Sequence, residues 1–192
     1  SRINQKAKAV VQTTFTTYDE ELCKILEPNV CTTKKRFEML LAMKEEGIPT
    51  VVWMDPILPF INDTKENLDG LLDYCIRAEV KGIICFGIGM TLRNGNREYF
   101  YQKLDEHFPG LKERYQRTYG NAYELGSPKG KMLFQRLQDT CKAHNILCTP
   151  EKVFAYINEF PYDKGYEQGK IDGIEEGKNS VDITIDNQEV YN

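Results

Sequence analysis

The stretch Thr50–Gly70, TVVWMDPILPFINDTKENLDG, begins as a short apolar strand and contains an interruption that decides where the strand ends. Pro56 has no amide N–H and disfavours helical backbone in the residue before it, so we expect the strand to end at Asp55. Asp63 opens a helix start signal, which predicts a helix over 64–78. The stretch therefore predicts a strand, a loop with Asp55 at the strand's carboxyl end, and a helix. In the competing interpretation, Asp55 only accepts backbone hydrogen bonds in a turn.

The alternation of strand and helix continues on both sides of this stretch. Strand patterns cover 9–15, 50–54 and 82–86, and helical patterns cover 33–46, 64–78 and later segments. Strands that alternate with helices favour a parallel sheet with right-handed crossovers. Because a closed α/β barrel takes eight strands and about 250 residues, the sequence predicts a partial barrel. It has about three parallel strands alternating with helices, plus C-terminal helices.

The predicted helix starts rest on side chains that can accept hydrogen bonds from free amides. Thr17 and Asp63 are each followed three residues later by a glutamate, which is the capping-box spacing. Ser127 precedes Pro128, as a cap precedes the first position of a helix. We expect each of these side chains to cap the next helix.

Two parts of the chain differ in composition. Residues 1–160 are predicted to form the partial barrel with its appended helices. Residues 161–192 form a polar, glycine-rich extension. Alternating apolar residues over 181–185 predict a short strand near its end, which we expect to cover an exposed sheet edge.

Composition and charge narrow the classes of function. The 192 residues are 41% hydrophobic, with a formal net charge of −4, which gives no general attraction to nucleic acid. No run approaches the roughly 20 apolar residues of a membrane span, and the opening residues do not resemble a secretion signal. We therefore expect a cytoplasmic protein without a membrane partner.

The six cysteines and two histidines show no metal-ligand spacing. The cysteines are therefore predicted to be reduced, and both residue types to be isolated side chains with no metal site.

Ligands bind at the carboxyl ends of parallel strands, which selects the segments 12–17, 53–62 and 85–93. In the first segment, alternation predicts a polar row of Gln12, Thr14 and Thr16. Threonines are also ordinary strand and cap residues, so a structural role remains the alternative for this row.

The third segment, CFGIGMTLR, has two glycines that let the backbone approach a flat ligand. Arg93 is a candidate anchor for a carboxylate or for a loop. The segment is not a dinucleotide fingerprint, because the third glycine and the following helix are missing.

Three stretches together resemble a known family. They are QTTFTTYDEELCKILEP, RFEMLLAMKEEGIPTVVWMDPILPFINDT and GIICFGIGMTLRNGNREYFYQKLDEHFPGLKERY. They are similar to the later half of radical S-adenosylmethionine (radical SAM) proteins of the spore photoproduct lyase-like group, over about Lys6 to Phe160.

The resemblance implies an activity for the whole protein. Radical SAM enzymes bind a 4Fe-4S cluster and cleave S-adenosylmethionine reductively, and the resulting 5′-deoxyadenosyl radical abstracts hydrogen from a substrate. Spore photoproduct lyase itself repairs a thymine photoproduct in DNA, and this likeness is the sole ground for expecting nucleic acid as a partner.

The cluster-binding CxxxCxxC motif of the family is absent from this sequence. The resemblance therefore predicts that the chain is a fragment, the C-terminal half of such a barrel. It predicts no catalytic residue, no bound cofactor and no turnover for this chain alone.

The resemblance also implies cofactor contacts at the three strand ends. They are Thr14 and Thr16 on the fourth barrel strand, Asp55 and Pro56 after the fifth, and Ile84, Phe86, Gly87 and Ile88 flanking adenine on the sixth. Arg93, Tyr119 and Tyr123 are substrate-side candidates, although tyrosines beside a glycine turn are more often packing residues. Glu27 and Arg36 match family positions too, with a structural ion pair as their competing role.

Two other functions stay open. The chain is alternatively an assembly domain, whose open half-barrel is covered by a second copy. It is also interpretable as a cluster-free α/β enzyme that uses Asp55 as a base, and the sequence identifies no partner acid or nucleophile for it.

Overall fold

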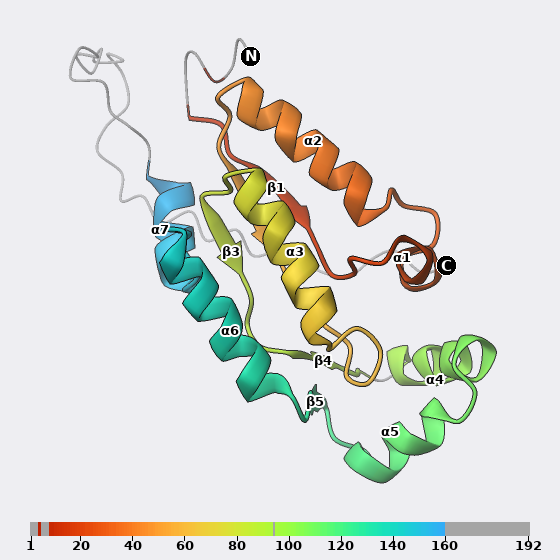
Figure 1. The fold of residues 1–192 in the computed structure, drawn as a ribbon. Helices are drawn as coiled ribbons and strands as arrows, with labels where there is room; N and C mark the ends of the chain where they lie inside the picture. Colours follow the sequence, from red (N-terminus) through yellow and green to blue (C-terminus); the bar gives the residue numbers. More distant parts are fainter. Residues whose placement is uncertain (1–3, 5–7, 94, 160–192) are drawn as a thin grey trace, which may run out of the picture. The chain divides into compact units, whose positions relative to one another are not determined.

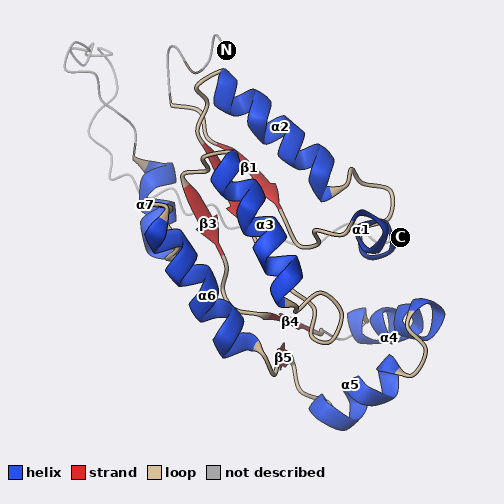
Figure 2. Cartoon of the chain, in the orientation of Figure 1, coloured by secondary structure: helices blue, strands red, loops and turns tan. Residues whose placement is uncertain are grey.

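The computed structural model describes residue 4, residues 8–93 and residues 95–159, which all belong to one compact unit, Ser1–Pro161. Figures 1 and 2 show the order of its helices and strands. They are β1 (Val11–Thr14), α1 (Glu20–Leu26), α2 (Thr33–Glu45), β2 (Thr50–Trp53), α3 (Lys65–Arg77), β3 (Gly82–Ile84), β4 (Gly89–Thr91), α4 (Asn96–His107), α5 (Leu111–Tyr119), β5 (Glu124–Gly126), α6 (Gly130–Ala143) and α7 (Pro150–Asn158). Within these ranges, no helix combines the length and the apolar character that crossing a membrane requires. The predicted extension 161–192 and its strand at 181–185 lie outside the described residues.

A parallel sheet forms the centre of this unit, with the strand order β1-β2-β3. Thr13 pairs with Val52, and Val52 pairs with Ile83. One parallel bridge, between Gly82 and Leu147, extends the sheet beyond β3. Helices follow each of the first two strands before the next strand begins. The predicted α/β class with about three parallel strands is confirmed, and the described strands do not close into a barrel.

All three strands of the sheet are shorter than the sequence predicts, and β2 covers Thr50–Trp53 instead of 50–54. β1 covers Val11–Thr14 instead of 9–15, and β3 covers Gly82–Ile84 instead of 82–86. The third strand ends early because the Phe86 amide donates to the carboxylate of Asp55 (2.8 Å) and not to a neighbouring strand. The chain therefore leaves the sheet at the point where a ligand site was expected.

The main hydrophobic core lies between one face of the sheet and helices α2, α3 and α6, which Figure 1 shows along the sheet. Val52 and Ile83 point into this core and are fully buried. Phe37 from α2 stacks on Tyr74 from α3, with ring centroids 4.1 Å apart. Each large apolar side chain buried in this way stabilises the fold by about 1.5–3 kcal/mol.

Helix α7 packs on the opposite face of the sheet. Val51 and Ile84, which alternate with the residues of the main core, form a small cluster with Val153 of α7. Gly82 permits this contact, because a Cβ atom at that position would lie 2.9 Å from a Val153 methyl carbon. The glycine at the start of β3 is thus explained by the close approach of α7.

Residues 89–126 form a subsidiary part with its own core. β4 and β5 pair as an antiparallel ribbon, and α4 and α5 lie between them in the chain. Pro109-Gly110 separates the two helices, since α4 ends at His107 and α5 begins at Leu111. The ribbon was not predicted. The core of this part consists of Leu92, Tyr101, Leu104, Tyr115 and Leu125, with Phe60 and Ile61 packed against it.

All three predicted caps are wrong by one to two residues. Asp19 caps α1 instead of Thr17, Thr64 caps α3 instead of Asp63, and Lys129 precedes α6 where Ser127 was expected. Tertiary partners explain these differences. The Thr17 hydroxyl accepts a hydrogen bond from Asn62, and the Asp63 carboxylate accepts one from the Ser127 hydroxyl.

Candidate functional site

The loop that follows β2 connects the sheet to the subsidiary part. Ile57 belongs to the main core, whereas Phe60 and Ile61 pack on the core of residues 89–126. The Tyr115 hydroxyl donates a hydrogen bond to the Pro59 carbonyl and ties α5 to the loop. Residues on this loop are therefore held from both sides, at the carboxyl end of the sheet.

Asp55 stands at the start of this loop, as predicted from the proline that follows it. Its carboxylate accepts a hydrogen bond from the Phe86 amide (2.8 Å). No cation among the described residues pairs with it, and burial raises its pKa from 3.8 to about 6, although the bond from Phe86 opposes this shift. A carboxyl group with one backbone donor and no counter-ion is poised to take a ligand or a proton.

A hollow of about 400 Å³ opens beside Asp55, between the end of the sheet and the ribbon. Its lining consists of Asp55, Phe86, Gly87, Ile88, Gly89, Met90, Thr91, Glu124, Leu125 and Gly126. Four of the predicted cofactor contacts, Asp55, Phe86, Gly87 and Ile88, thus share one hollow. Ile84 does not line it, because its side chain is fully buried against α7.

The phenyl ring of Phe86 gives this hollow an aromatic wall. Phe86 is 66% exposed, which is unusual for a large apolar side chain. Its ring centroid lies 6.2 Å from that of Trp53, the protein's single tryptophan. Gly89 is required on the other wall, because a Cβ atom there would lie 2.5 Å from the Leu125 carbonyl oxygen.

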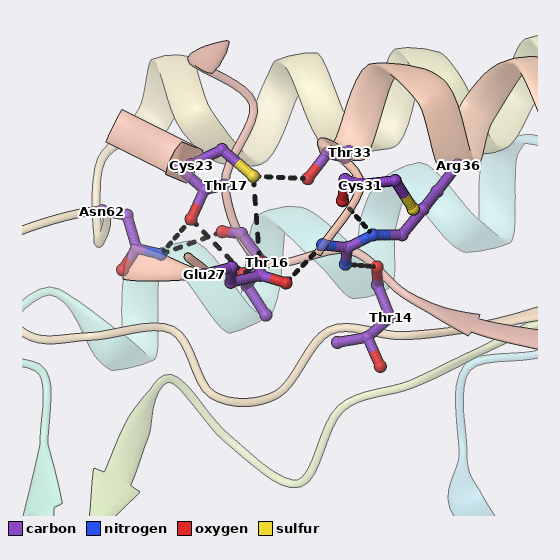
Figure 3. A network of polar contacts seen from close by, with 9 residues as sticks. All are labelled: Thr14, Thr16, Thr17, Cys23, Glu27, Cys31, Thr33, Arg36 and Asn62. Atoms are coloured by element: carbon purple, nitrogen blue, oxygen red, sulfur yellow. Dashed lines mark hydrogen bonds and ion pairs between the residues drawn. The ribbon is translucent and has the colours of Figure 1, made fainter. Parts of the chain in front are cut away.

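A network of polar contacts closes the end of β1 (Figure 3). Arg36 donates to the Thr14 carbonyl (2.6 Å) and to the Cys31 carbonyl (2.9 Å), and it forms an ion pair with Glu27. Burial by itself would lower the pKa of Arg36, but the hydrogen bond and charge of Glu27 outweigh it and raise that pKa. Arg36 therefore holds the outer edge of β1 and the segment after α1 in one arrangement.

Thr16 and two asparagines complete this network. The Thr16 hydroxyl donates to Glu27 (2.6 Å), and the Thr16 carbonyl accepts from both Asn62 and Asn67 (2.9 Å each). The Asn62 side chain also accepts from the Leu58 amide (2.5 Å), so it fastens the loop after β2 to the end of β1. Sequence reasoning missed both asparagines, which stand in a polar run that otherwise predicts a helix start.

The two predicted threonines differ in their availability. The side chain of Thr14 points away from the network in Figure 3, and its hydroxyl makes no hydrogen bond to the described part of the chain. Thr16 is 7% exposed, and its hydroxyl donates its proton to a hydrogen bond with Glu27.

A second hollow has a volume of about 250 Å³. Its lining consists of Thr14, Thr16, Leu26, Glu27, Pro56, Leu58 and Asn62. Asp55 lines the first hollow and Pro56 lines the second. The two hollows therefore adjoin in the chain at the Asp55-Pro56 dipeptide.

The substrate-side candidates are divided between two places. Arg93 donates to the Tyr123 hydroxyl (3.4 Å), and both residues line an open hollow of about 460 Å³ with Arg97. The hydrogen bond and charge of Arg93 lower the pKa of Tyr123. Tyr119 instead donates to the Gly126 carbonyl (2.6 Å) and packs on Phe60, which is the packing role given as its alternative.

The cysteines do not offer a binding site for an iron-sulfur cluster. Among the residues that the structure describes, no group of three or more His, Cys, Asp or Glu side chains could hold a metal ion. Cys75, Cys85 and Cys141 are buried in the main core, and burial raises the pKa of the last two to about 12. The described residues therefore do not fit a 4Fe-4S cluster.

Comparison with known proteins gives relatives without an assigned activity. No family model matches the chain. The chain is 29% identical over 133 residues to uncharacterized proteins of Mycobacterium bovis and of two Mycobacterium tuberculosis strains. The match covers 69% of this chain, and the chain spans about 38% of the length of these relatives. No solved structure matches significantly.

Proposed function

We propose that this chain forms the later part of a radical SAM barrel of the spore photoproduct lyase-like group, as the wall that faces S-adenosylmethionine. The observation that carries the proposal is the gathering of predicted contacts. Thr14, Asp55, Phe86 and Gly87 come from three strand ends and line two hollows that adjoin at Asp55-Pro56. The reaction class proposed for the whole protein is reductive cleavage of S-adenosylmethionine and hydrogen abstraction from a substrate.

The chemistry of the two hollows supports this ligand. S-adenosylmethionine carries a flat base, ribose hydroxyls, a sulfonium and an amino acid group. Phe86 offers an exposed ring to a base, Thr14 offers a hydroxyl without a hydrogen-bond partner among the described residues, and the Asp55 carboxylate complements a positive charge. Because the described residues do not fit the cluster, no reaction step is assigned to them. Their proposed part is to bind and orient the cofactor and to exclude water from it.

The outer edge of β1 supports the position of this wall in a larger sheet. The amides of Val11 and Phe15 bond to β2 and the residue before it, so the intervening Gln12 and Thr14 amides point to the other edge. In the described residues no strand pairs with that edge. A further barrel strand would pair there beside Gln12, since Arg36 already donates to the Thr14 carbonyl. A second copy of the chain is the alternative occupant, which would make the chain an assembly domain.

The raised pKa of Asp55 favours one further candidate, a cluster-free enzyme. A carboxylate with a pKa of about 6 can act as a general base near neutral pH. Glu124 lines the same hollow and brings a second carboxyl group to it. Such an enzyme would not need S-adenosylmethionine, so the binding experiment below separates the two proposals.

The test is a titration with S-adenosylmethionine, followed by the fluorescence of Trp53. Half a site holds its ligand weakly, so we expect saturable binding with a dissociation constant on the order of 1 mM, too weak to survive purification. S-adenosylhomocysteine, which lacks the sulfonium charge, should bind more weakly. Asp55→Asn and Thr14→Val should each weaken binding, whereas Lys131→Gln on the surface of α6 should not.

Two outcomes would contradict the proposal. Absence of saturable binding in the wild type would remove its basis, and so would binding that the Asp55 and Thr14 variants leave intact. Incubation with iron and sulfide should give no cluster absorbance and no 5′-deoxyadenosine from this chain. Either product would show that the cluster site lies within it.

A further inference from the structure

A fourth hollow lies on the helix side of the loop that follows β2. Its volume is about 180 Å³, and its lining consists of Phe60, Asp63, Thr64, Arg114, Pro128 and Lys129. It shares no residue with the hollows around Asp55 and Thr14. The volume is below the roughly 300 Å³ at which pockets for drug-sized ligands begin. A ligand there is the size of a single small polar group.

The guanidinium of Arg114 stacks on an aromatic ring at this hollow. Its central carbon lies 3.9 Å from the centroid of the Phe60 ring, a cation–π contact. Phe60 is itself held, because its ring packs edge-on against Tyr115, with centroids 5.5 Å apart. Phe60 also adopts a left-handed backbone conformation with φ +65°, which bulky residues rarely adopt. The loop therefore holds an uncommon conformation that places an aromatic ring beneath a cation.

Positive charge dominates the lining. In the described part of the chain, neither Arg114 nor Lys129 has an acidic side chain within ion-pair distance. Asp63 is the opposing charge, but it is 2% exposed and already accepts a hydrogen bond from Ser127. The starts of α3 at Lys65 and α6 at Gly130 add the positive ends of two helix dipoles.

We propose that this hollow binds a phosphate-type oxyanion between Arg114 and Lys129. The planar guanidinium presents two parallel N–H groups to a pair of phosphate oxygens, while the lysine supplies a mobile point charge. The phosphate group belongs either to the free ion or to a small phosphomonoester. This proposal does not depend on S-adenosylmethionine binding.

The experiment titrates the complete chain with inorganic phosphate at constant ionic strength, followed by calorimetry. We expect saturable binding at one site, weakened about tenfold or more by Arg114→Gln and by Lys129→Gln, as for loss of a charge-assisted contact. Arg117→Gln on α5 and Lys131→Gln on α6 make the same change in charge outside the lining, and both should bind phosphate like the wild type. Circular dichroism checks that all four variants are folded, which is expected because these side chains lie on the surface.

A second titration, with phenyl phosphate, assigns the source of the phosphate group. Tighter binding than inorganic phosphate assigns the site to a phosphomonoester, and equal or weaker binding assigns it to the free ion. Absence of saturable phosphate binding would overturn the proposal. Equal weakening by Arg117→Gln and Arg114→Gln would also overturn it, because the attraction would then be a general effect of surface charge.

Discussion

The carboxyl ends of β1 and β2 lie side by side in the sheet, but their polar groups are treated differently. At the end of β1, Arg36, Glu27 and Thr16 satisfy one another within a buried network. At the end of β2, Asp55 has one backbone donor and no cationic partner among the described residues. Burial opposes the charge of both groups, but Glu27 outweighs this effect at Arg36, whereas no cation offsets it at Asp55 among the described residues. The first group therefore holds the shape of this edge, whereas the second is available for a ligand.

The largest effect is expected from breaking the network at its centre. Arg36→Met leaves the Glu27 carboxylate without its counter-ion and removes donors from two backbone carbonyls. We expect a loss of about 3 kcal/mol in the free energy of unfolding, the lower end of the range for a broken buried ion pair. Urea denaturation measures it.

Arg77 provides the matched control for Arg36, because its ion pair with Asp73 is on the surface, with both side chains more than half exposed. Arg77→Met should cost less than about 1 kcal/mol. Equal losses in the two variants would mean that the network at the end of β1 has no special structural role.

A smaller loss is expected when the network is separated from the loop after β2. Asn62→Ala removes donors from Thr16 and Thr17 and the acceptor of the Leu58 amide. Leaving buried polar groups without partners should lower the free energy of unfolding by about 1–3 kcal/mol. The exposed Asn121→Ala is the control, with a change within about 0.5 kcal/mol. A neutral Asn62→Ala would show that the loop is held by its apolar residues alone.

Replacing Asp55 by asparagine should raise the free energy of unfolding instead of lowering it, and the gain should depend on pH. The folded-state pKa of about 6 lies above the ordinary value of 3.8, so the folded state binds the proton more tightly. Stability from this group is complete below the ordinary pKa and is lost as pH rises through about 6. The free energy of unfolding of Asp55→Asn should therefore be about 1 kcal/mol higher than that of the wild type near pH 7.5, with solvent screening taken into account.

This stability difference should disappear near pH 4, where the wild-type carboxyl group is protonated in the folded state. Urea denaturation across this pH range measures it, with Asp73→Asn as the control for an exposed carboxylate. A wild type that becomes more stable relative to Asp55→Asn as pH rises would mean that Asp55 has a cationic partner, and the contrast with Arg36 would fail.

The smallest change in stability is expected at Thr14. Its hydroxyl makes no hydrogen bond to the described residues, so Thr14→Val should alter the free energy of unfolding by less than about 0.5 kcal/mol. Thr16→Val should cost about 1–3 kcal/mol, because Glu27 loses a buried donor. Urea denaturation of both variants gives the comparison. Equal costs would show that the two threonines do not differ in availability.

Local patterns explain how much of this architecture the sequence predicts. The apolar runs at Val51–Val52 and Ile83–Ile84 indicate strands, and Pro56 correctly separates Asp55 from β2. The β4–β5 ribbon escapes such reasoning, because its two three-residue strands pair across more than thirty intervening residues. The caps were misplaced for the same reason, since Thr17 and Asp63 bind partners that are distant in sequence.

The residues of the candidate site are also predictable from the sequence only in part. Asp55, Phe86 and Gly87 follow strands directly, so their convergence at one edge of a parallel sheet was predictable. Ile84 stands apart from them, because its side chain packs on Val153 where α7 returns to the sheet. Asn62 and Asn67 gave no distinguishing signal, since their partner is a backbone carbonyl about fifty residues away.

Amide hydrogen exchange with and without S-adenosylmethionine tests whether the ends of the three strands form one cofactor-facing wall. We expect slower exchange on binding in residues 15–17, 54–58 and 85–89, with no change in α5 at Leu111–Tyr119. Unchanged exchange in the three segments at saturating S-adenosylmethionine, or protection confined to other parts of the chain, would contradict the existence of such a wall.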